Sequence, residues 1–130
     1  MKFKPLVLGL AVASLVLGAP AAAAGAATPM HVVAKQTAVG AYAVAMGAGN
    51  ATRPARMELV LTAKPRQAAE VSWDLVCTEN SGGVGSTMKQ RKVVVPTVIA
   101  LKPPAPSASC IASASAQLAA SGSLTVAIED

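Results

Sequence analysis

The side chains in this 130-residue chain that could carry catalysis are few and widely spaced. The chain has one histidine, His31, and two cysteines, Cys77 and Cys110. Acid-base and nucleophilic catalysis need partners held within hydrogen-bond reach of each other. Glu70 and Asp74 share one face of an expected strand at i and i+4, which places them roughly 13 Å apart, too far for a glycosidase carboxylate pair. We therefore expect a non-catalytic protein, and a hydrolase with an unrecognised site is the alternative.

The run Lys89-Gln90-Arg91-Lys92 is the one dense basic stretch, and it stands directly before three valines. One hypothesis is that Lys89, Arg91 and Lys92 dock on an anionic wall polymer or on lipid headgroups. The other is that these charges, with Pro96 on the far side of the valines, keep an aggregation-prone strand from pairing with other chains. The sequence leaves both hypotheses open.

The net charge of the whole chain is +5, and two of its positive charges, Lys2 and Lys4, stand at the N-terminus. Capture of nucleic acid generally needs a denser basic face than the remainder provides. Two thiols and one distant histidine do not make a tetrahedral zinc site. We therefore expect no nucleic-acid partner, no metal and no other cofactor.

The first 27 residues have the pattern of a secretion signal. The two lysines precede the apolar stretch 6–19, which is too short to favour a membrane-spanning helix. Pro20 and the alanine-rich run 21–27 follow and offer several small-x-small cleavage sites. We expect residues 1–27 to be a signal peptide and residues 28–130 to be one exported domain without a stable membrane span.

Export to an oxidising compartment favours a disulfide between Cys77 and Cys110, joining the two sheets of a sandwich. Such a bond closes a loop of about 33 residues, which corresponds to roughly 3 to 4 kcal/mol in the chain-entropy account. The composition is 53% hydrophobic but only 2% aromatic, so the expected core consists mainly of small aliphatic side chains. The contribution of a covalent cross-link is a large fraction of the net free energy of unfolding of a domain with such a core.

Apolar residues after His31 recur with a period of two, which indicates strands. Val71, Trp73, Leu75 and Cys77 share one face, with Trp73 as the expected core anchor. Ala112, Ala114 and Ala116 alternate with polar residues in a strand whose small inward side chains allow close approach of the sheets. We expect a sandwich of about seven strands from the candidate segments 30–37, 41–46, 57–62, 70–77, 86–95, 97–101, 110–118 and 123–129. Turns are expected at 47–50 and 64–66, a flexible loop at 79–85 and an extended connector at 102–106.

The chain resembles small exported proteins of high-GC Gram-positive bacteria. The resemblance is carried by the motif V-S-W-D-L-V-C at 71–77, a Gly-rich loop, a Pro-rich connector and the segment S-C-I-A-S-A-S-A-Q-L-A-A-S-G-S-L-T-V at 109–126. The resemblance covers about half of the domain and implies an Ig-like antiparallel β-sandwich with no particular activity. Trp73 precedes Cys77 by four residues, whereas in immunoglobulin domains the core tryptophan follows the first cysteine. The strand order therefore stays open.

These observations predict a secreted, non-catalytic module that lies outside the cell or on its wall and binds a macromolecule of the cell envelope or has a structural role there. The partner and the oligomeric state cannot be predicted from the residues. A surface-associating effector that uses the basic stretch is the first alternative.

Overall fold

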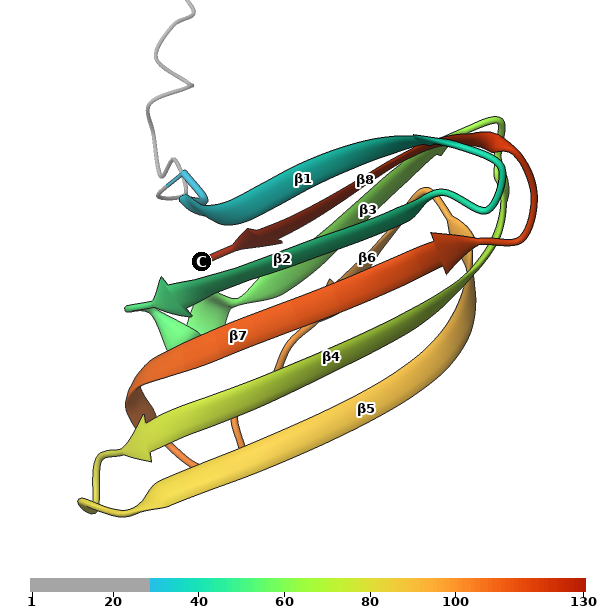
Figure 1. Cartoon of the computed structure of the whole chain (residues 1–130). Coiled ribbons are helices and arrows are strands. Elements are labelled where there is room, and N and C mark those ends of the chain that lie inside the picture. The colour runs from blue at the N-terminus through green and yellow to red at the C-terminus, as the bar shows by residue number, and fades with distance from the viewer. Residues whose placement is uncertain (1–28) are drawn as a thin grey trace, which may run out of the picture.

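Eight strands make up most of residues 29–130, the part of the chain that the computed structural model describes (Figure 1). The predicted signal peptide, residues 1–27, lies outside the described residues. Each of the eight candidate segments forms a strand, and one short 3-10 turn, η2 (Pro54–Arg56), precedes the third. The strands are β1 (Val32–Gly40), β2 (Val44–Ala51), β3 (Glu58–Lys64), β4 (Gln67–Glu79), β5 (Val84–Val95), β6 (Thr97–Ala100), β7 (Ser107–Leu118) and β8 (Gly122–Glu129).

The strands form two antiparallel sheets, with the orders β1-β8-β3-β6 and β2-β7-β4-β5. The first strand pairs with the last, the second with the seventh, the third with the sixth and the fourth with the fifth. The chain is thus a nested hairpin folded over into two layers, which is the jelly-roll connectivity. The predicted antiparallel sandwich is confirmed. Its strand order, which the sequence left open, differs from that of immunoglobulin domains, which have other neighbours in each sheet.

The core lies between the two sheets and is built from alternate residues of each strand. On β4 the predicted inward residues are buried, and Trp73 is only 7% exposed. The small inward residues of β7, Ala112, Ala114 and Ala116, are buried as well. The two layers come into close contact at the β1–β2 edge, where a Cβ atom on Gly49 would lie 2.8 Å from the backbone oxygen of Val33. Gly49 is therefore required for the close approach of β1 and β2, a contact that the sequence did not predict.

The prediction of a turn at 47–50 is wrong, because these residues form the second half of β2. Glycine usually weakens a strand, but here Gly47 and Gly49 face the first strand of the other sheet, and at Gly49 no larger side chain fits beside Val33. The turn at 64–66 and the connector at 102–106 are confirmed. The loop predicted at 79–85 is shorter than expected, since β4 ends at Glu79 and β5 begins at Val84.

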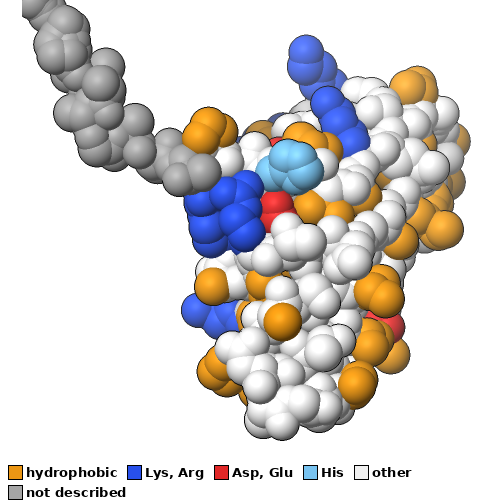
Figure 2. Space-filling view, turned by 90° about the vertical axis from the view of Figure 1, so that its left-hand side faces the viewer, with side chains coloured by type: hydrophobic (Ala, Val, Ile, Leu, Met, Phe, Trp, Pro, Cys, Tyr) orange, Lys and Arg blue, Asp and Glu red, His pale blue; other side chains and the backbone are white. Residues whose placement is uncertain are grey.

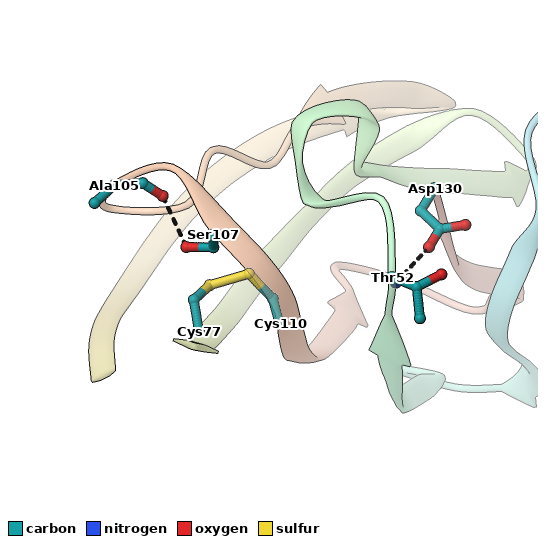
Figure 3. The surroundings of a disulfide bond; sticks show 6 residues. All are labelled: Thr52, Cys77, Ala105, Ser107, Cys110 and Asp130. Carbon is teal, nitrogen blue, oxygen red and sulfur yellow. Dashed lines mark hydrogen bonds between the residues drawn. A yellow bond between two sulfur atoms is a disulfide. The ribbon is translucent and has the colours of Figure 1, made fainter. Parts of the chain in front are cut away.

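The predicted disulfide between Cys77 and Cys110 is present, and both residues are buried (Figure 3). The sequence led us to expect a bond between the two sheets, and this expectation is wrong. Cys77 and Cys110 are directly opposite each other on the neighbouring strands β4 and β7, with their Cα atoms 4.0 Å apart. The bond therefore cross-links the two central strands of one sheet, because the strand order makes neighbours of segments that the sequence could not pair.

Candidate functional site

The outer face of the β2-β7-β4-β5 sheet is built from the residues that alternate with the core, and it faces the viewer in Figure 1. Its side chains form rows that run across the four strands. One row consists of Met46, Ser115, Ser72 and Gln90, and the next consists of Ala48, Ser113, Asp74 and Met88. In these two rows Met46, Gln90 and Met88 are the largest side chains and stand on the edge strands, whereas the serines of the central strands are small. The face is therefore hollowed along its middle.

The larger of two hollows on this face has a volume of about 460 Å³. Met46 on β2 and Met88 on β5 form opposite walls and are 58% and 77% exposed. The floor between them consists of Ala48, Ser72, Ser113 and Ser115, with the backbone of the strands beneath. Methionine side chains adapt to ligands of irregular shape, so these walls are suited to an apolar partner.

Polar groups in the larger hollow are few and fixed on strands. Asp74 is the one charged side chain that lines it, and it is partly buried. Gln36 reaches across from β1, where its Oε1 accepts a hydrogen bond from the backbone N–H of Met46 at 2.6 Å. This bond satisfies a donor on the open edge of β2 and fixes that wall of the hollow. The arrangement offers one negative charge and several hydroxyl groups to an otherwise apolar ligand.

A second hollow of about 290 Å³ lies on the same face, at the row that contains Glu70, Lys92 and Gln117. Tyr42, in the turn after β1, forms one side of it and is 60% exposed. Glu70, Lys92 and Gln117 contribute polar groups. The two hollows follow one another along the strands, and together they form a strip on this face.

The structure places the two carboxylates considered for catalysis in different hollows. Glu70 lines the smaller hollow and is paired in register with Lys92, whereas Asp74 lines the larger one opposite Met88. Ser72 lies between them on the same strand face. The expected separation along one strand is therefore present, and the two groups face different parts of the surface.

The basic stretch falls on β5, which is an edge strand, and is divided between the two sides of its sheet. Lys89 and Arg91 lie opposite the core residues Trp73 and Val71, on the inward side. Lys92 lies on the outward side opposite Glu70. All three side chains are exposed. A flat anionic surface would meet the three together only if it approached the strand along its edge.

A third cluster, which the sequence did not reveal, surrounds Asp130. This residue is 1% exposed, and its Oδ2 accepts hydrogen bonds from the backbone N–H groups of Thr52 and Arg53 at 2.9 and 3.2 Å (Figure 3). Its Oδ1 lies 3.7 Å from both the Arg53 guanidinium and His31 Nδ1. Figure 2 shows the blue basic side chains and the pale-blue histidine side by side around a red carboxylate.

His31 is also tied to Asp130 through the backbone, with reciprocal hydrogen bonds of 2.7 and 2.9 Å. These bonds extend the β1–β8 ladder by one pair beyond Val32. No sequence signal links His31, Arg53 and Asp130, because only the pairing of the first strand with the last brings them together. The cluster ties the end of β8 to the start of β1 and to the segment after β2.

Among residues 29–130, no group of three or more His, Cys, Asp or Glu side chains is arranged to hold a metal ion. The same residues include no helix of the length and hydrophobicity needed to cross a membrane. Comparisons with family models, with curated proteins and with solved structures found no match to this chain. Functional inference therefore depends on the geometry of its own surface.

Proposed function

We propose that the chain is a secreted, non-catalytic binding module that presents the outer face of the β2-β7-β4-β5 sheet to another protein of the cell envelope. The observation that carries this proposal is the strip formed by the two hollows, which has exposed Met46, Met88 and Tyr42 along its sides. Exposed apolar surface arranged around a concavity is typical of interaction sites.

The architecture supports this use because the strip stands on strands and not on loops. The serines of its floor belong to β4 and β7, the two strands that the Cys77–Cys110 disulfide joins. A site on such a support keeps its shape before the ligand arrives, which lowers the entropic cost of binding. The adaptable methionine walls then fit the partner.

The chemistry of the lining indicates the kind of partner. Asp74 is the one charged residue of the larger hollow, and its surroundings are methionine, alanine and serine. A protein segment with an apolar side chain next to a lysine or arginine fits both features. A carbohydrate fits less well, because sugar sites depend on stacked aromatic rings and Tyr42 is the one exposed ring among residues 29–130.

The proposal is tested with the double variant Met46→Ser/Met88→Ser and the control Val39→Ser, which changes a residue that is 79% exposed on the other sheet. Each purified protein is used to capture envelope proteins, and the captured partner is then purified and titrated directly. We expect the double variant to bind at least about tenfold more weakly, since each buried side chain contributes about 1 kcal/mol or more. The control should bind like the wild type. Equal affinity of all three proteins would refute the proposal.

Docking of the basic stretch on an anionic surface is a second candidate, because Lys89, Arg91 and Lys92 are exposed. The division of these side chains between the two sides of the sheet favours a linear partner along the strand edge over a flat surface.

A further inference from the structure

Strand β5 has an open edge that runs along all twelve of its residues. It pairs with β4 on one side only, and it is the longest of the four strands that end the two sheets. A strand with unpaired N–H and C=O groups is a template for another extended chain. Whether the open edge of β5 binds such a chain depends on which backbone groups it presents and on which side chains prevent pairing with unsuitable strands.

The register identifies the backbone groups that the open edge presents. The N–H of Ala119 donates to the oxygen of Ala68 at 3.0 Å, so the even-numbered residues of β4 bond to β7. The odd-numbered residues of β4, including Val71 and Trp73, therefore bond to Arg91 and Lys89. The alternate residues of β5 are Met88, Gln90 and Lys92. Their backbone N–H and C=O groups therefore point away from β4, toward the open edge.

Lys89 and Arg91 occupy the positions at which an added strand would bring its side chains closest. Residues whose backbone groups point away from a partner form the non-hydrogen-bonded pairs, with Cα atoms about 4.5 Å apart. Both side chains are exposed, and within residues 29–130 neither has an ion pair or a hydrogen bond. No acidic residue stands on β5. The edge therefore offers two unneutralised positive charges spaced at i and i+2.

The same charges oppose pairing with a second copy of the chain. In an antiparallel pair of β5 strands centred on Gln90, Lys89 of one copy would stand directly opposite Arg91 of the other. Like charges in direct opposition destabilise a strand pair. The edge thus repels itself and attracts a strand of opposite charge.

We propose that β5 accepts an extended acidic segment of another protein by strand addition, with two carboxylates at alternate positions opposite Lys89 and Arg91. Main-chain hydrogen bonds to Met88, Gln90 and Lys92 supply part of the affinity, and the two ion pairs select the sequence. This proposal does not depend on the hollows of the outer face, so either can fail without the other.

The test uses the purified protein and a fluorescent peptide of alternating threonine and glutamate, followed by fluorescence anisotropy. A second peptide has the same side chains but is N-methylated at alternate residues, so that it keeps its charge and loses its donors. The protein variant is Lys89→Glu/Arg91→Glu, which keeps the edge charged and so does not promote aggregation. Its matched control is Lys35→Glu/Lys102→Glu, which reverses two exposed charges elsewhere.

We expect the unmodified peptide to bind the wild-type protein and the N-methylated peptide to bind it at least about tenfold more weakly. The affinity of the edge variant for the unmodified peptide should fall by a similar factor, and that of the control variant should not change. Hydrogen exchange should slow at the amides of Met88, Gln90 and Lys92. Equal binding of both peptides, or equally tight binding of anionic vesicles, would show charge docking without strand addition and would overturn the proposal. Failure of the unmodified peptide to bind would also overturn the proposal. The charges would then serve only to keep the edge strand from pairing with other chains.

Discussion

Asp130 shows at the scale of a single residue how this sandwich is closed. It is the one buried charged residue among residues 29–130, and it receives two backbone hydrogen bonds from the segment after β2. A carboxylate in this position replaces the water that the N–H groups of Thr52 and Arg53 would otherwise bind. Removing it leaves two partly buried N–H donors without this acceptor, which costs more than the bonds contribute in net terms.

We predict that Asp130→Ala lowers the free energy of unfolding by about 2 to 3 kcal/mol. Asp130→Asn should cost clearly less, because an amide oxygen still accepts the two N–H bonds and only the charge beside Arg53 is lost. Urea unfolding followed by tryptophan fluorescence measures both, since Trp73 is buried in the core. Equal stability of the alanine variant and the wild type would show that water replaces the carboxylate without cost.

Strand β2 shows at the scale of an element why composition alone misplaced a turn. Gly49 faces β1, and a Cβ atom there would lie 2.5 Å from Cγ1 of Val33. At Gly47 the nearest atom to such a Cβ is Cβ of Ala34 at 3.5 Å, an ordinary van der Waals distance. A side chain therefore has no room at Gly49 but has room at Gly47, although both residues lie in the same strand.

We predict that Gly49→Ala destabilises the protein by about 1 to 3 kcal/mol, because the first strand must shift to admit the methyl group. The matched control Gly47→Ala should be neutral or slightly stabilising, since it removes conformational freedom from the unfolded chain without a clash. Thermal unfolding of the two variants measures the difference. A similar melting temperature for both would contradict the close approach of β1 and β2.

The basic stretch on β5 gives a second prediction at this scale. Changing Lys89, Arg91 and Lys92 together to Gln removes the charges that guard a twelve-residue edge next to three valines. We expect faster aggregation, measured by light scattering, because an uncharged open edge pairs with its own copies. Weaker adhesion to anionic vesicles without added aggregation would instead favour surface docking.

Much of the fold could be predicted from alternation of residue types along each strand. The inward face of β4, with Trp73 and Cys77, follows from period two alone, and so does the small-residue face of β7. Alternation also predicted that Glu70 and Asp74 share a face. It could not show that Met46 and Met88 stand on opposite walls of one hollow, since that depends on which strands are neighbours.

Strand order is a property of the whole molecule, and it decides three features that the sequence missed: the position of the disulfide within one sheet, the walls of the larger hollow and the cluster around Asp130. The partner of each strand is set by contacts between segments far apart in the chain, such as His31 with Asp130. The disulfide gives the same lesson, because the even cysteine count and the expected export predicted the bond but not that it lies within one sheet. Nested pairing of the first strand with the last also makes most contacts long-range, which raises the entropic cost of folding.

At this scale we predict that Cys77→Ala/Cys110→Ala lowers the free energy of unfolding by about 3 to 4 kcal/mol, because the unfolded chain regains the freedom of the closed loop. Urea unfolding of the variant, compared with the oxidised wild type, measures the loss. Reduction of the wild type should cause a similar loss. Unchanged stability in both experiments would mean that the sheet holds without its cross-link.

The central claim is that the outer face of the β2-β7-β4-β5 sheet is the binding surface. It is tested most directly by hydrogen exchange of the protein alone and in complex with its captured envelope partner. The account predicts that slowed exchange is concentrated in β2, β4, β5 and β7 around Met46, Asp74 and Met88. Protection concentrated on β1, β8 and β3, with these strands unchanged, would contradict it.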